Sequence, residues 1–167
     1  MPDPEANGLL TNDYVAPRNE TEKAIEQANK TIELDSSFAE AYFNLGMTYF
    51  KTHEFAKAAP ELETAVRLSG RRPVMLGMLG TIYIKLGRTD EAKKILAELE
   101  SPPMNNDKLY ATVSIKSYLG QSEEVWKILE QLLKERYGIM IYMKLEREFV
   151  LQNNDPRYNV FLKTMGL

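Results

Sequence analysis

The side chains that most often perform catalysis or hold metal ions are scarce in this sequence. It contains no cysteine and one histidine, His53, so thiolate chemistry and multi-histidine metal sites are excluded. The segment 77–80 lacks the Lys-Ser/Thr pair of a phosphate-binding loop. Asp155 lacks the alternating oxygen ligands and distal Glu of a calcium loop. We therefore expect no enzyme activity, no metal and no cofactor, and we interpret His53 as a polar turn residue.

The composition and charge indicate a folded protein without affinity for polyanions. Apolar residues make up 44% of the chain, and 21 basic against 24 acidic residues give a net charge of −3, which supplies no positive field for nucleic acid. The longest uncharged apolar run, 74–84, falls well short of the ~20 residues that span a bilayer. The start of the sequence carries no signal-peptide pattern. We expect a cytoplasmic protein whose partner is a protein or peptide, with neither nucleic acid nor membrane as a ligand and with an undetermined oligomeric state.

Apolar and small residues recur along the chain at one fixed interval. The pattern Leu45-Gly46 followed by Tyr49 returns as Leu79-Gly80 followed by Tyr83, an offset of 34 residues (79 − 45). Ala24, Ala58 and Ala92 keep the same offset twice. A period of this length is typical of repeat proteins, in which neighbouring units bury a continuous core.

Within each period the apolar residues lie three and four positions apart, which predicts two amphipathic helices. The short polar segments 52–54 and 87–89 join the helices of each pair, so each unit is a helical hairpin. Three groups of residues fit helix-capping signals: Ser37 with Glu40, Asn19 with Glu22, and Asp155-Pro156 with Gly166 at the end of the helix that they start.

This pattern of Leu-Gly, Tyr, a turn Gly and Ala resembles the tetratricopeptide repeat family. The resemblance implies an all-α fold, a right-handed α–α superhelix of about three and a half helix-turn-helix repeats with a C-terminal capping helix. The expected divisions are an N-terminal extension at 1–20 that is partly ordered, repeats at 21–136 and a capping segment at 137–167. The repeats comprise a half unit at 21–38 that supplies only a second helix, complete units at 39–72 and 73–106, and a degenerate unit at 107–136.

Three departures from the pattern affect the prediction. Gly120 arrives one residue early, so either the turn of the third unit is shortened or its whole first helix is shifted. Pro60 falls inside a second helix, where we expect a kink and not a break. Residues 1–18 do not fit a first helix, although apolar side chains at 9–15 could cover the half unit.

The C-terminal part has a narrower resemblance. Residues 153–167, with Leu119-Gly120 and Trp126 before them, are similar to the tetratricopeptide tails of bacterial signalling proteins such as nucleotide cyclases and winged-helix transcription regulators. The resemblance implies that the chain is the partner-sensing tail of such a regulator or a free-standing relative.

A second apolar stripe on the helix at 39–51 suggests a binding surface, because one stripe would suffice for the hairpin. In this family that face lines the concave groove. A clamp for a peptide carboxylate is not expected there, because Val74 and Met78 stand where it needs basic residues. The resemblance implies the following groove residues: Glu40, Phe43, Asn44, Met47, Phe50, Lys51, Met78, Thr81, Ile84, Lys85 and Tyr118.

The leading functional prediction is a non-enzymatic scaffold that docks an extended or helical segment of another protein in the groove. The alternative is a regulatory or sensory domain of a larger bacterial signalling protein, a cyclase or transcription regulator. In a third interpretation the N-terminal segment or the terminal helix of this chain fills the groove. The sequence leaves these alternatives open.

Overall fold

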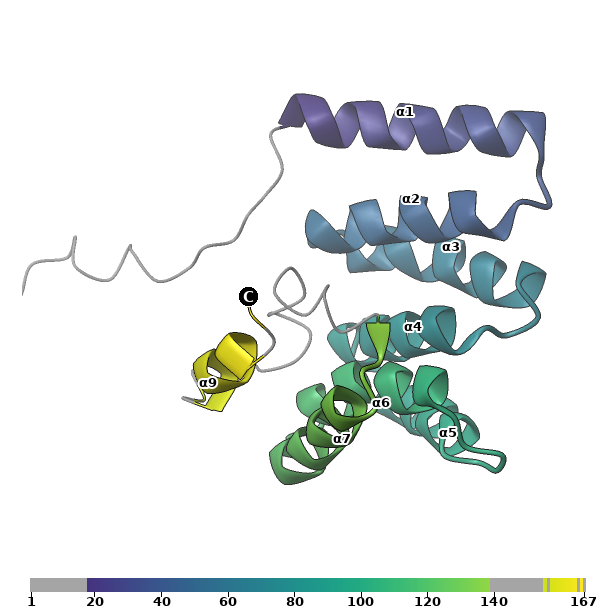
Figure 1. Ribbon diagram of the computed structural model, residues 1–167. Helices are drawn as coiled ribbons and strands as arrows, with labels where there is room; N and C mark the ends of the chain where they lie inside the picture. Colours follow the sequence, from purple (N-terminus) through teal and green to yellow (C-terminus); the bar gives the residue numbers. More distant parts are fainter. Residues whose placement is uncertain (1–17, 139–154, 156, 165, 167) are drawn as a thin grey trace, which may run out of the picture.

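The computed structural model describes residues 18–138, 155, 157–164 and 166 (Figure 1). All regular structure in these ranges is helical: α1 (Arg18–Leu34), α2 (Ala39–Lys51), α3 (Phe55–Leu68), α4 (Pro73–Lys85), α5 (Thr89–Leu99), α6 (Asn106–Tyr118), α7 (Ser122–Lys134) and α9 (Arg157–Thr164). From α1 to α7, consecutive helices pack against one another in a curved stack. This confirms the predicted all-α solenoid of helical hairpins.

The turn inside each hairpin contains one residue with a left-handed backbone. Gly87 and Gly120 have φ angles of 75° and 76°, and His53 holds the equivalent place with φ 60°. In all three turns the amide of this residue bonds the carbonyl three positions earlier, and the next amide bonds the carbonyl five positions earlier. Glycine adopts this conformation without steric cost. His53 is thus a turn residue, as predicted, and its ring meets the Phe55 ring edge-on at 5.8 Å.

The third hairpin is displaced by one residue as a whole. Helices α6 and α7 begin 33 residues after α4 and α5 (106 − 73 and 122 − 89), so the turn at Gly120 is not shortened. The displacement arises after α5, which ends at Leu99 although the end of α3 at Leu68 predicts residue 102 (68 + 34). Pro102 and Pro103 follow, and proline cannot continue a helix interior.

The two capping boxes predicted for α1 and α2 are wrong. The residue before α2 is Phe38, and it makes no side-chain capping bond. Ser37 lies one residue before this position, and its amide and hydroxyl both donate to Asp35 Oδ1, at 2.9 and 2.6 Å. Helix α1 already includes Asn19, so that residue does not precede the helix as a cap would.

Two other predictions concern single helices. Helix α3 runs continuously through Pro60, so the proline does not break it, and the kink expected there stays a prediction. Helix α9 follows Asp155, whose Oδ1 accepts the Arg157 amide at 2.9 Å. Gly166 lies beyond the helix with φ 75°, which fits a residue that ends it.

Glycines allow helices to approach closely at two kinds of contact. A Cβ on Gly46 would lie 2.7 Å from Leu62 Cγ, in the same hairpin, as the sequence predicted. A Cβ on Gly80 would meet Ile95 Cγ2 of its own hairpin at 3.4 Å, but Ile115 Cδ1 of the next hairpin at 2.4 Å. Gly80 therefore serves mainly the contact between α4 and α6. The sequence had predicted that it serves the contact within its own hairpin.

The contact between α4 and α6 is the tightest of these approaches. A Cβ on Gly77 would lie 2.5 Å from the main-chain oxygen of Ala111. One turn further on, Thr81 Oγ1 lies 2.9 Å from Ser114 Oγ and is fully buried. Small residues on α4 thus bring two first helices of neighbouring hairpins into direct backbone contact.

Candidate partner-binding groove

The predicted groove residues all lie on the first helices α2, α4 and α6, but they differ in exposure. Helix α2 places residues 40, 43, 44, 47, 50 and 51 on one side, because positions three and four apart share a helix face. Asn44, Lys51 and Lys85 are exposed; Glu40, Phe43, Met47, Met78, Ile84 and Tyr118 are half-buried; Phe50 and Thr81 are buried.

The two buried residues offer no surface to a partner in this conformation. Phe50 is 3% exposed, and its ring centroid lies 5.5 Å from that of Phe55. Thr81 is buried against α6 through Ser114. The apolar spacing of Phe50 is the same as that of its exposed neighbours, so the sequence pattern alone could not separate them.

Phe43 and Met47 form the apolar part of the face on α2. Both pack against the core and stay partly exposed. The repeat offset of 34 equates them with Gly77 and Thr81 of α4, which are buried under α6. Helix α2 has no comparably extensive contact with α4, and α3 lies between them in Figure 1. Large side chains on α2 therefore occupy positions that α4 fills by close helix packing.

The polar residues around this face fall into paired and exposed groups. Glu40 forms an ion pair with Arg72 at the start of α4. Lys85 Nζ lies 4.4 Å from the centroid of the Tyr118 ring, a distance suited to a cation–π contact. Asn44 and Lys51 are exposed, so these two polar side chains remain accessible beside Phe43 and Met47.

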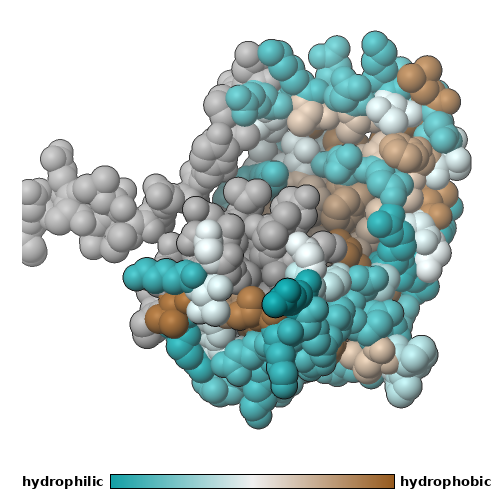
Figure 2. Space-filling model, in the orientation of Figure 1, coloured by the Kyte–Doolittle hydropathy of each residue, from teal (hydrophilic) through white to brown (hydrophobic). Residues whose placement is uncertain are grey.

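A hollow along α1 was not predicted from the sequence. It measures about 600 Å³ and is lined by Glu22, Ile25, Glu26, Asn29, Lys30 and Glu33. The three- and four-residue spacing among these lining residues places them on one face of α1. Figure 2 adds that apolar surface gathers over the α1 to α3 end of this view, whereas the α5 to α7 end is mainly hydrophilic. Leu34, after this hollow, is 82% exposed.

A buried lysine in α6 was also missed. Lys116 lies between two carboxylates, with its Nζ 2.7 Å from Glu100 Oε1 and also paired with Glu124. Burial lowers the pKa of Lys116, but the two hydrogen bonds together outweigh it, so the pKa is raised above its ordinary value. Its place corresponds to Tyr49 and Tyr83 of the earlier units (83 + 33 = 116). The signal was therefore a charged residue at an aromatic position of the repeat.

No group of three or more acidic or histidine side chains in the described ranges could hold a metal ion. None of the helices described is both long and apolar enough to cross a bilayer.

Comparison with protein families identifies the repeat. The model described as tetratricopeptide repeat matches residues 49–113, and one described as TPR repeat matches residues 16–52. Both are repeat families, and they point to a non-catalytic domain. The matches overlap at 49–52, so together they extend without a gap from α1 into α6.

Three relatives share parts of this sequence. The bifunctional subunit NrfFG of the formate-dependent nitrite reductase complex of Haemophilus influenzae is 28% identical over 69% of this chain and 31% of its own length. Mouse tetratricopeptide repeat protein 21A is 27% identical over 88% of this chain and 12% of its own. Anaphase-promoting complex subunit 3 of Schizosaccharomyces pombe is 32% identical over 53% of this chain and 13% of its own length.

This chain spans less than a third of each of these relatives. One of them, protein 21A, is itself named a tetratricopeptide repeat protein. Residues 16–113 of this chain are tetratricopeptide repeats.

Proposed function

We propose that this chain is a non-enzymatic interaction module that binds a peptide or helix of a partner protein against α2. The single observation that carries the proposal is the face formed by Phe43 and Met47. These large apolar side chains stay partly exposed at positions where α4 carries the buried Gly77 and Thr81. An apolar anchor flanked by polar groups is the usual composition of a protein interface.

The proposed contact set is narrower than the eleven residues that the resemblance implied. Phe43 and Met47 supply the apolar anchors, and exposed Asn44 and Lys51 orient the partner from the rim. Met78, Ile84 and Tyr118, half-buried on α4 and α6, extend the surface. Glu40 and Lys85 contribute through their pairs with Arg72 and the Tyr118 ring. Phe50 and Thr81 support the surface from the core.

The test compares the partners retained by the wild type and by a Phe43→Ala/Met47→Ala variant. Each truncation of an interface anchor typically costs on the order of 2 kcal/mol of binding energy, so a partner bound at this face should be lost. Leu34→Ala is the matched control, because Leu34 is an exposed apolar residue of α1 that does not belong to the proposed contact set. Equal recovery of every partner by a folded double variant would move the site to another face. Loss of folding would favour a groove filled by the chain itself.

A second proposal follows from the size of the relatives. Because the chain covers less than a third of each, repeats of this kind occur within longer proteins. The C-terminal resemblance supports the version in which the longer protein is a bacterial cyclase or transcription regulator, acting in the cytoplasm, with 21–136 as its repeats and 137–167 as their cap. The full reading frame around the gene tests this directly, and a frame without any signalling domain would contradict it.

A further inference from the structure

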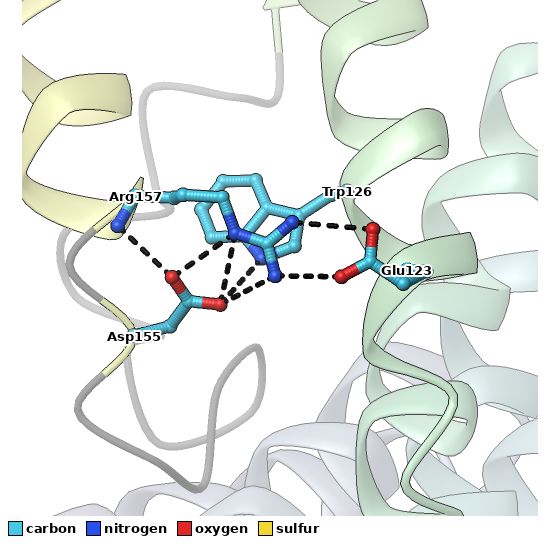
Figure 3. Close-up of polar contacts among 4 residues, drawn as sticks. All are labelled: Glu123, Trp126, Asp155 and Arg157. Carbon is cyan, nitrogen blue, oxygen red and sulfur yellow. Dashed lines mark hydrogen bonds and ion pairs between the residues drawn. The ribbon is translucent and has the colours of Figure 1, made fainter.

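Trp126 on α7 contacts Asp155 and the helix α9 that follows it. Its indole Nε1 donates to Asp155 Oδ2 at 2.9 Å. The guanidinium carbon of Arg157 lies 5.0 Å from the centroid of its ring. The Phe161 ring meets it edge-on, with centroids 5.8 Å apart. Figure 3 shows Asp155, Arg157 and Glu123 around the indole, which is only 4% exposed.

Among the second helices α3, α5 and α7, the tryptophan occurs only on α7, which contacts α9. The repeat offsets place Ala59 of α3 and Lys93 of α5 at the position of Trp126 (126 − 33 = 93, 93 − 34 = 59). A small residue and an exposed lysine therefore stand at this place in the two preceding second helices. Of these three helices, the one that contacts Phe161 is the one that carries an aromatic side chain at this position.

Among the described side chains, the contact of α9 with α7 combines a buried aromatic pair, Trp126 and Phe161, with an ion pair that is accessible to water. Arg157 pairs with Glu123 at 3.0 Å, but the two side chains are 45% and 76% exposed, and such pairs contribute little to stability. On α9, Phe161 is buried whereas Val160 is 66% exposed. A helix of eight residues is too short to be stable alone in water, so its helical form depends on this docking.

We propose that the Trp126 face of α7 is a peptide-docking surface, distinct from the groove on α2, and that α9 is its ligand. The surface recognises a short helix with the pattern Asp-x-Arg-x-x-x-Phe, supplied here by Asp155, Arg157 and Phe161. The aspartate caps the helix and accepts the indole N–H, the arginine covers the ring, and the phenylalanine is the apolar anchor. Because α9 is one short helix, and Phe161 is the one apolar side chain that its described residues bury, the segment is exchangeable, and the same segment of a second copy takes its place.

The experiment uses the full chain and a labelled synthetic peptide of residues 153–167. In the wild type the tethered α9 competes with the peptide at a high effective concentration. Phe161→Ala in the chain weakens the tethered copy and leaves the Trp126 surface intact. Fluorescence anisotropy should show at least tenfold tighter binding of the peptide to this variant than to the wild type. Val160→Ala, which changes an exposed neighbour on α9, should bind the peptide as the wild type does.

Two further variants keep the test decisive. Trp126→Ala added to Phe161→Ala should abolish binding, and a peptide with Phe161→Ala should not bind any chain. Should Phe161→Ala disturb folding, Arg157→Ala removes the exposed clasp without leaving a buried cavity and should still increase peptide binding. Trp126, the one tryptophan in the sequence, reports release of α9 through a red-shifted emission. Peptide binding that is equal in all chains, or absent from a folded chain whose emission shows α9 released, would overturn the proposal.

Discussion

Replacing Gly77 by alanine tests the tight contact between α4 and α6. The new Cβ would lie 2.5 Å from the main-chain oxygen of Ala111, whereas ordinary contacts begin near 3.4 Å. The two helices must therefore separate by about 0.9 Å, since a main-chain atom cannot rotate away as a side chain can. That separation also stretches the buried contact between Thr81 and Ser114, which stands at 2.9 Å.

The change in unfolding free energy that Gly77→Ala causes is the sum of two losses and one gain. Overpacking typically costs ~1–3 kcal/mol, and weakening one hydrogen bond costs ~0.5–1.5 kcal/mol. Replacing glycine by alanine inside a helix stabilises the folded state by ~1 kcal/mol. We expect Gly77→Ala to lose about 2 kcal/mol of unfolding free energy, which for a chain of this size lowers the melting temperature by ~4–8 °C.

Thermal melts followed by circular dichroism measure this loss, with two glycines for comparison. Gly138→Ala is the control, because its new Cβ meets no atom of the described residues within 4 Å, and its melting temperature should stay near that of the wild type. Gly80→Ala should lose less than Gly77→Ala, because its nearest neighbour is the movable end of Ile115. A Gly77→Ala protein that melts with the Gly138→Ala protein would refute the close approach of α4 and α6.

Three other predictions follow from the structure. Lys116→Ala should lower the free energy of unfolding in urea by ~1–3 kcal/mol, because its ammonium and buried stem are both lost, and Lys116→Met should lose less by keeping the stem. Burial and, next, a hydrogen bond to Glu63 raise the pKa of Tyr83 from 10 to about 12, so its contribution to stability is present below pH 10 and lost between pH 10 and 12. Burial and a hydrogen bond to Asp107 also raise the pKa of Tyr137, so ultraviolet titration should show more than one late tyrosine, and Glu63→Gln should move only the Tyr83 step to lower pH. His53→Gly should raise the melting temperature, because it removes a left-handed non-glycine residue that costs ~1 kcal/mol.

The hairpins were predictable because the repeat pattern records which faces are buried. Leu45, Gly46 and Tyr49 recur at one offset, and each hairpin needs the same small and large side chains at its contact. The early position of Gly120 showed that one residue is missing from the period. It did not show where along the chain that residue is lost. It depends on α5 ending before Pro102, which a fixed period cannot express.

The groove and the caps were less predictable because they depend on neighbours that the local pattern does not show. Phe43 and Phe50 have the same helical spacing, yet only Phe50 is buried, against Phe55 of the following helix. Ser37 fits a capping box, but Asp35 takes both of its donors. The surface around Trp126 joins residues 29 or more apart, outside the reach of a repeat search.

The early end of α5 has a consequence for engineering this protein. The loop between Leu99 and Asn106 absorbs a whole residue of difference in repeat length without altering the hairpin that follows. Its residues 100–105 are exposed. A tag or a reporter domain inserted there would leave both flanking helices in register, whereas the same insertion inside α6 would separate Ala111 from Gly77 and divide the stack in two.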